Sequence, residues 1–315
     1  MKKLNLSINE IFLKDERFRI SYYFDLEKLV ASIREIGLLN PPLVTRRNGR
    51  FILVSGWKRV MACLNLSLSP IPVLVVQGKG ELETFLIAFY ENLATGEFSL
   101  VEKAEIMARL KKFSEDEKKI VRHYLPLLDI PPTLSHLDSY LAFSQFEPEL
   151  KKIIHEKNLP FSLAELFSEF STSERKRLLP LVSPLSQNKM TEFLESLKEI
   201  SRRDELPVRK ILASKEVKDM LGSRRLSLLQ KADRIRLVLK KKRYPNLSSW
   251  EESFDSLRKK MRWPREITLS PTPYFEEKRL SVDFNFENQE EFKANLLKLE
   301  ELASKREFSE LFKFK

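Results

Sequence analysis

The first third of the chain alternates between strand-like and helix-like patterns of hydrophobic residues. Apolar residues recur at helical spacing between Asp25, which can cap a helix, and Gly37, which can end it. The face they form comprises Leu26, Leu29, Val30, Ile33 and Ile36. The segments that follow are predicted as strand 43–47, an Asn48-Gly49 turn, strand 51–55, helix 57–66, strand 71–76 and helix 81–92. This alternation predicts a mixed α/β domain over residues 1–110.

The next hundred residues have an almost entirely helical pattern. Glycine is absent between Phe98 and Ser214, and prolines mark the expected helix breaks. These breaks are Pro126, Pro131, Pro132, Pro148, Pro160, Pro180, Pro184 and Pro207. We therefore predict a domain of short packed helices over residues 111–221.

The last segment, residues 222–315, begins with a basic helix between Arg224 and Arg243. Leu280, Val282, Phe284 and Phe286 then alternate with polar neighbours and predict a half-buried strand. A charged helix is expected over residues 289–305. The whole chain is thus predicted to be an α+β multidomain protein, with a small α+β domain at its C-terminal end.

Composition narrows the class of protein. No apolar run approaches the roughly 18 to 20 residues that cross a bilayer, and the first residues lack the pattern of a secretory signal, so we expect no membrane association. One cysteine, Cys63, excludes an internal disulfide and fits the reducing cytoplasm. With only three histidines besides this thiol, we expect no transition-metal site.

The net charge of +11 is concentrated in one stretch. Between Lys198 and Arg243 there are sixteen basic and six acidic residues, a net of +10. A polyanion is the natural partner of such a stretch, although a solvated helical face or an acidic protein would also account for it.

The junction between strand 51–55 and helix 57–66 has the features of a phosphate-binding corner. Gly56 lets the backbone approach an anion closely, and the first helical turn presents unpaired N–H groups. Lys58 and Arg59 oppose the helix dipole unless an anion is present. The alternative is a simple turn glycine followed by Trp57 as a packing residue.

Several motifs in order give the first domain a resemblance to a known family. They are the helix end from Ser32 to Leu38, the PPLV segment 41–44, a glycine-plus-basic box from Gly56 to Ala62, the Glu91-Asn92 pair, and a helix containing Glu102 and Ala104. In this order they resemble the N-terminal domain of ParB-type chromosome-partitioning proteins, within the ParB/sulfiredoxin-like superfamily.

The resemblance implies a nucleotide site on an α/β fold. By position, Gly56, Lys58 and Arg59 would face the phosphates of CTP. Glu91 and Asn92 would contribute to nucleotide contacts, with Glu91 on the side of a Mg²⁺ ion.

The chain also departs from the family pattern. Trp57 replaces a glutamate of the box, Lys58 replaces its first arginine, and Ala94 and Thr95 stand where the family has glutamine and arginine. Lysine loses the bidentate geometry of arginine. We therefore expect CTP binding to be weakened or altered, with weak or absent hydrolysis. Trp57 also stands where sulfiredoxins have their reactive cysteine, which disfavours sulfinic-acid reduction.

The helical region resembles the helix-turn-helix that follows in this family. A reading helix after Pro131 and Pro132 would present its outward residues to DNA. These are Thr133, Ser135, His136 and Ser139. The helix has no lysine or arginine, so a role in packing alone stays open.

The later basic residues would bind DNA phosphates without reading bases. They are Arg202, Arg203, Arg209, Lys210, Arg224, Arg225, Lys240, Lys241, Lys242 and Arg243.

The function predicted from these features is that of a ParB-like DNA-binding protein. It would act in chromosome or plasmid partitioning or in transcription regulation, with CTP as a possible switch. We expect a cytoplasmic homodimer that binds DNA and a ParA-type ATPase.

One alternative is a free-serine-type kinase, in which Glu91 or Glu102 would act as base. Another is a scaffold with a vestigial nucleotide pocket. No paired acidic cluster supports a nuclease.

Overall fold

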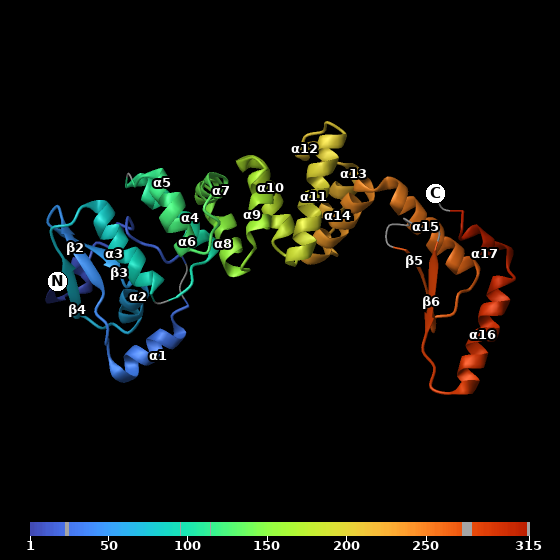
Figure 1. Ribbon diagram of the computed structural model, residues 1–315, viewed down its shortest axis with the longest axis horizontal. Coiled ribbons are helices and arrows are strands. Elements are labelled where there is room, and N and C mark those ends of the chain that lie inside the picture. Colours follow the sequence, from blue (N-terminus) through green and yellow to red (C-terminus); the bar gives the residue numbers. More distant parts are fainter. Residues whose placement is uncertain (23–24, 95, 114, 273–278, 314–315) are drawn as a thin grey trace. The chain divides into compact units, whose positions relative to one another are not determined.

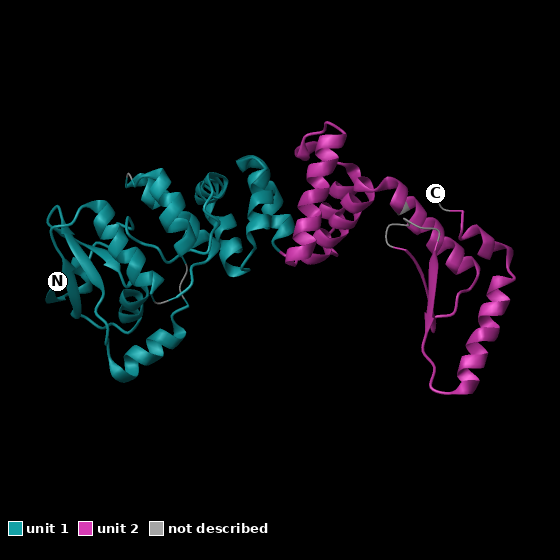
Figure 2. Cartoon of the chain, in the orientation of Figure 1, with its two compact units in different colours: residues 1–183 teal, residues 184–315 magenta. Residues whose placement is uncertain are grey.

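The computed structural model describes residues 1–22, 25–94, 96–113, 115–272 and 279–313 (Figure 1). Thr95 therefore lies outside the described residues. The chain divides into two compact units, residues 1–183 and 184–315 (Figure 2). The boundary between them falls inside the region that the sequence predicts as one helical domain, and the three-part division stays a prediction.

A four-stranded mixed sheet forms the N-terminal end of the first unit (Figure 1). Its order is β1-β4-β2-β3. The strands are β1 (Lys2–Leu6), β2 (Leu43–Arg47), β3 (Arg50–Ser55) and β4 (Ile71–Val76). β2 pairs parallel with β4, and the outer pairs are antiparallel. Asn48 and Gly49 both have positive φ, as a two-residue hairpin requires, and this confirms the predicted turn.

Three helices accompany this sheet, and their apolar residues complete its core. They are α1 (Glu27–Ile36), α2 (Trp57–Asn65) and α3 (Glu81–Leu93), and a short 3-10 turn, η1 (Ile8–Glu10), follows β1. Val60, Ala62 and Cys63 of α2 are fully buried in one cluster with strand residues. The mixed α/β character predicted for this region is confirmed.

The first helix shows both the strength and the limit of the sequence pattern. Gly37 ends α1 with φ of 75°, as predicted. The N-cap is Leu26 rather than the predicted Asp25, although the Asp25 carboxylate accepts a hydrogen bond from the Glu27 amide at 3.1 Å. Ile36 was expected on the buried face but is 60% exposed, so the face is narrower than predicted. Ile36 is the last residue of the helix.

The rest of the first unit is helical (Figure 1). Its elements are α4 (Leu100–Lys112), α5 (Glu117–Lys119), the π-helical turn η2 (Ile120–Tyr124), α6 (Leu125–Leu127), α7 (Leu134–Ser144), α8 (Pro148–Glu156), α9 (Phe161–Ser168) and α10 (Thr172–Val182).

Two prolines were wrongly predicted as breaks. Pro126 lies in the first turn of α6, where a missing N–H is tolerated, and helical structure runs through it from residue 117 to 127. Pro180 lies inside α10. Lys176 and Pro180 are both exposed, so water can hydrogen-bond the carbonyl that lacks its helical donor.

A buried ion pair joins the start of α8 to α10. Arg175 donates from Nε and Nη2 to the two carboxylate oxygens of Glu147, each at 3.0 Å, and both side chains are 11% exposed. The guanidinium also stacks 5.0 Å above the ring of Phe146. Burial alone would raise the pKa of the Glu147 carboxyl, but the hydrogen bonds from Arg175 hold this pKa below its usual value.

In the second unit, α11 (Gln187–Arg203) and α14 (Leu228–Arg243) pack side by side along a seam of ion pairs. Lys189 pairs with Asp233, Glu192 with Arg236, and Glu199 with Arg243. The constant offset of 44 residues means that the two helices run parallel. Between them in the chain lie α12 (Val208–Leu212) and α13 (Lys215–Gly222).

The C-terminal part of this unit contains α15 (Pro245–Lys260), the antiparallel strands β5 (Ile267–Pro271) and β6 (Leu280–Phe284), α16 (Gln289–Ala303) and α17 (Arg306–Glu310). The α+β character predicted here is confirmed. The predicted burial of β6 is wrong at two positions, because Val282 is 40% exposed and Phe286, beyond the strand end, is 52% exposed. Within the described residues, no helix is long and apolar enough to cross a membrane.

The depressed pKa of Glu147 leads to a prediction about acid stability. A carboxyl whose pKa is lower in the folded than in the unfolded state stabilises the fold above the unfolded pKa of about 4.3. That stabilisation is lost as the pH falls through the folded pKa. Wild type should therefore lose more unfolding free energy between neutral and acid pH than Glu147→Gln, as measured by urea denaturation across the pH range.

The neighbouring Glu149→Gln provides the control for this experiment. Glu149 is exposed, so its substitution should leave the pH dependence of wild type unchanged. Parallel pH profiles for wild type and Glu147→Gln would contradict the assignment.

Candidate functional site

The corner between β3 and α2 depends on Gly56. Its φ of 92° and ψ of 28° lie in the left-handed region. A Cβ at this position would stand 2.8 Å from the Pro42 Cβ and 3.0 Å from the Pro42 Cα. Both the backbone conformation and the space therefore require glycine, and Pro42, immediately before β2, packs directly on the turn.

The first turn of α2 presents a positive surface. No acidic residue lies in this turn, and no side chain caps its N–H groups. Lys58 is exposed and forms no ion pair with any described residue. Unpaired N–H groups and the positive end of a helix dipole together favour an anion here.

Arg59 reaches across to α3. Its side chain is 20% exposed, and Nη2 donates to Glu91 Oε1 at 2.6 Å. Nη1 donates to the carbonyl oxygens of Asn40 and Pro41 at 3.2 and 3.4 Å. Arg59 is therefore held between residues 40–41, which precede β2, and the last turn of α3.

Ser55 completes the group of residues around Glu91. Its hydroxyl donates to the second carboxylate oxygen of Glu91, and Asn92 Nδ2 lies 3.4 Å from the same hydroxyl. Asn92 also donates to the Ala88 carbonyl at 2.7 Å. The structure thus brings Gly56, Arg59, Glu91 and Asn92 together and adds Ser55, while their role in binding a nucleotide stays a prediction. The sequence signal that could have identified Ser55 is a hydroxyl residue at the end of an apolar strand.

Trp57 lies under this corner. It is 4% exposed, and its indole Nε1 has no hydrogen-bond acceptor within the part of the chain that the structure describes. The Arg19 guanidinium lies 5.2 Å above its ring, a contact that the sequence did not suggest. Trp57 packs into the core as expected. Its buried N–H is a donor that an oxygen of a ligand or water could satisfy.

Glu102 and Cys63, two further residues considered from the sequence, are both buried. Glu102 accepts from the amides of Ser99 and Tyr22 at 2.9 and 3.0 Å and is 8% exposed, so it serves as a capping residue of α4. Burial raises the pKa of the Cys63 thiol. No group of three or more His, Cys, Asp or Glu that could hold a metal occurs among the described residues.

The helix-turn-helix-like segment is formed by the 117–127 stretch and α7. Thr133 caps α7 by accepting from the His136 amide, and its hydroxyl lies 2.7 Å from the His136 ring. The His136 ring also packs on Phe161, and Ser139 donates to Glu165 at 3.3 Å. Thr133 and Ser135 are exposed, whereas His136 and Ser139 are partly buried.

Cations missing from α7 occur on the preceding stretch. Lys118 and Arg122 are exposed, four residues apart, on α5 and η2. In a helix-turn-helix the first helix crosses the DNA backbone, so these positions could contact phosphates. The sequence interpretation did not include them.

The predicted basic run at the end of α14 is largely neutralised. Lys241 pairs with Glu252, Lys242 with Glu216, and Arg243 with Glu195 and Glu199. Arg203 pairs with Asp204 and donates to the carbonyls of Lys242 and Arg243. Other predicted cations form no ion pair with a described residue. They are Arg202, Arg209, Lys210, Arg224 and Arg225, all exposed, and Lys240, which is partly buried.

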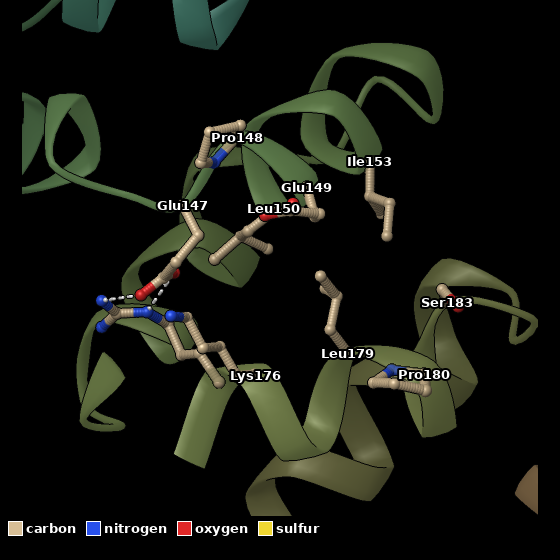
Figure 3. Close-up of a pocket in the computed structure, with 10 residues that line it drawn as sticks. Glu147, Pro148, Glu149, Leu150, Ile153, Lys176, Leu179, Pro180 and Ser183 are labelled. Carbon is tan, nitrogen blue, oxygen red and sulfur yellow. Dashed lines mark hydrogen bonds and ion pairs between the residues drawn. The ribbon is translucent and has the colours of Figure 1, made fainter. Parts of the chain in front are cut away.

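A separate pocket of about 610 Å³ lies between α8 and α10 (Figure 3). Leu150, Ile153 and Leu179 form its apolar part, and Glu147 at its edge is held by Arg175. None of its lining residues belongs to the predicted site.

Residues 5–93 match the family model described as the ParB N-terminal domain. The chain is 31% identical over 231 residues to the chromosome-partitioning protein Spo0J of Thermus thermophilus, covering 65% of this chain and 79% of that one. It is 26% identical over 159 residues to the probable chromosome-partitioning protein ParB of Borreliella burgdorferi, covering 50% and 58%.

One solved structure with a local likeness is the C-terminally truncated ParB from Caulobacter crescentus complexed with CTP-γ-S. It is 20% identical, with a TM-score of 0.28, over 57% of this chain and 99% of that chain.

The contacts of Gly56 predict the effect of a methyl group there. Gly56→Ala should destabilise the first unit by about 2 kcal/mol or more, since the left-handed conformation costs about 1–2 kcal/mol and the overlap with Pro42 adds to it. Gly49→Ala is the matched control, because Gly49 also has positive φ but a Cβ there would meet nothing within 4 Å. Equal losses of unfolding free energy in chemical denaturation would show that the contact with Pro42 is unimportant.

Proposed function

The chain belongs to the ParB family of chromosome-partitioning proteins, and on this premise we propose that it is a DNA-binding protein whose Gly56 corner binds CTP with Mg²⁺. The observation that carries the nucleotide part is the corner itself. A glycine-only turn, an uncapped helix start and Arg59 converge beside Glu91 and Asn92. We propose weak or absent hydrolysis.

The Arg59–Glu91 pair supports a ligand that carries both signs of charge. The two side chains neutralise each other at 2.6 Å and are both less than one-third exposed. A group that replaces Glu91 at Arg59 must be negative, and a group that replaces Arg59 at Glu91 must be positive. A magnesium nucleotide offers both, and Mg²⁺ is commonly held by one or two carboxylates together with phosphate oxygens.

The same contacts disfavour the kinase alternative. A kinase needs a carboxylate free to accept the proton of the acceptor hydroxyl. Glu91 is occupied by Arg59 and Ser55, and Glu102 is consumed by the cap of α4. A scaffold with a vestigial pocket remains the alternative that the first experiment distinguishes.

Removing Arg59 should weaken nucleotide binding. Hydrogen bonds to charged groups contribute about 1.5–3 kcal/mol, so Arg59→Ala should lower CTP affinity by about 10- to 100-fold. Calorimetry with CTP and with ATP, each with and without Mg²⁺, measures this. The exposed Arg34→Ala on α1 is the control and should bind as wild type does. Wild type that binds neither nucleotide would favour the scaffold.

We propose two surfaces for DNA. Thr133 and Ser135, at the exposed start of α7, would contact base edges or phosphates, and Lys118 and Arg122 on the stretch before them would contact phosphates. In the second unit, the cations that form no ion pair with a described residue are candidates for sequence-independent phosphate contacts. We propose that His136 and Ser139 do not contact DNA themselves. Their contacts with Thr133 and Glu165 orient the start of α7.

The paired and unpaired cations of the second unit provide a matched test. Replacing Arg224 and Arg225 by glutamine should reduce the salt dependence of binding to mixed-sequence DNA by a log–log slope of about 2. Replacing Lys241 and Lys242 by glutamine should have a much smaller effect, because these lysines already pair with Glu252 and Glu216. Fluorescence anisotropy at several salt concentrations measures both. If replacing the two lysines reduced the slope more than replacing the two arginines, the DNA-binding surface would lie at the end of α14 instead.

We also propose that the chain forms a homodimer through an apolar surface on β6, the residues after it, and α16. Val282, Phe286 and α16 residues Phe292, Leu296 and Leu297 are each at least 36% exposed, which is unusual for large apolar side chains so close together in sequence. Phe286 and Phe292 already pack on each other at 4.9 Å, so the surface is preformed. A ParA-type ATPase as partner and a cytoplasmic location are proposed from family membership.

A further inference from the structure

The pocket between α8 and α10 has no part in the proposed function, and it shares no residue with the Gly56 corner. Its volume of about 610 Å³ lies within the range of pockets that hold small organic molecules, about 300–1,000 Å³. Leu150 and Ile153 of α8 face Leu179 of α10 across it (Figure 3). Aliphatic side chains on both walls favour a ligand with an aliphatic body.

Pro180 leaves a hydrogen-bond acceptor at the α10 wall. Because proline has no N–H, the carbonyl of Lys176, four residues earlier, lacks its usual helical donor. Lys176 and Pro180 both line the pocket, and this carbonyl points along α10 from one toward the other. A ligand with an N–H group could donate to it in place of water. The α10 wall therefore favours a ligand that carries a donor.

Lys176 also supplies the positive charge that is available to a ligand. The Arg175 guanidinium is already engaged, because Nε and Nη2 donate to Glu147 and Nη1 donates to the Phe170 carbonyl at 2.6 Å. Lys176 is exposed and forms no ion pair with a residue that the structure describes. On the α8 wall, Glu149 is an exposed carboxylate and repels an anion. The charges thus favour an anionic group on the α10 side, beside Lys176.

We propose that this pocket binds a small amphipathic carboxylate with an aliphatic chain and an N–H group next to its charged end. The chain lies between Leu150, Ile153 and Leu179, where it is removed from water. The N–H donates to the Lys176 carbonyl, and the carboxylate pairs with the Lys176 ammonium. An N-acylated amino acid carries these three groups in this order. The site needs neither CTP nor DNA, so its failure would leave the proposed function unaffected.

N-octanoylglycine is the probe, and two matched analogues each remove one group. N-octanoylsarcosine lacks the N–H, and N-octanoylglycinamide lacks the charge. The protein is the full chain with labelled leucine and isoleucine methyl groups, so that an NMR titration measures both the affinity and the place of binding. We expect a Kd on the order of 1 mM, as for other probes of this size, with shifts at Leu150, Ile153 and Leu179. The sarcosine should bind about 3- to 10-fold more weakly, and the amide about 2- to 5-fold.

Two variants assign the polar contacts. Lys176→Gln should lower the affinity for N-octanoylglycine about 2- to 5-fold and leave that for N-octanoylglycinamide unchanged. Pro180→Ala returns an N–H to α10 that bonds the Lys176 carbonyl, so the preference for N-octanoylglycine over N-octanoylsarcosine should disappear. Arg177→Gln is the matched control, because Arg177 is exposed on the same helix and does not line the pocket. It should bind each probe as wild type does.

Several outcomes would overturn the proposal. Wild type that shows no shifts at the three aliphatic pocket residues with about 10 mM probe would have no such site. Shifts confined to Leu296 and Leu297 would place the probe on the exposed apolar surface of α16 instead. An amide that binds wild type as tightly as the acid, or an Arg177→Gln variant that loses as much affinity as Lys176→Gln, would refute the role of the ammonium. A preference for glycine over sarcosine that survives Pro180→Ala would refute the role of the carbonyl.

Discussion

The positive φ of Gly56, with Pro42 packed against it, is the constraint on which the rest of the site depends. Because no side chain fits between the turn and Pro42, β3 can pass directly into α2 without a longer loop. This abrupt passage places Ser55 at one end of the corner and Arg59 at the other, both in contact with Glu91. A longer turn would separate Ser55 from Arg59, and the two could then no longer both contact Glu91 on α3.

Arg59 and the basic residues of the second unit illustrate one distinction between charge in a sequence and charge available to a ligand. Arg243 looks like part of a polyanion-binding run, yet it is 12% exposed and divides its donors between Glu195 and Glu199. Arg59 is also paired, but with a carboxylate that is itself positioned to meet a cation. The first pairing is structural because both partners lie in the packed seam of α11 and α14. On the proposed function the second would be exchanged, because a magnesium nucleotide would satisfy both of its members.

Local signals account for what the sequence predicted well. The Asn48-Gly49 hairpin and the end of α1 at Gly37 need left-handed backbone, and only a few residue types adopt it readily. The meeting of Gly56, Arg59, Glu91 and Asn92 was anticipated through the family resemblance, since residues 32 positions apart carry no local sign of contact. The burial of Val282 and a helix break at Pro180 were mispredicted, because each depends on which distant side chain or solvent lies opposite. The ion pairs of the α14 lysines could not be predicted for the same reason.

The absence of lysine and arginine from α7 then has a physical meaning for DNA recognition. Most of the affinity of a DNA-binding protein comes from phosphate contacts, and most of its sequence preference from groups that reach base edges. Here the cations lie on other elements, Lys118 and Arg122 before α7 and Arg224 and Arg225 in the second unit, whereas α7 presents short hydroxyl side chains. On the proposed function, affinity and base reading would thus be divided between elements. Lys118 and Arg122 both lie on the continuous 117–127 stretch, so a phosphate contact there would act directly next to the start of α7.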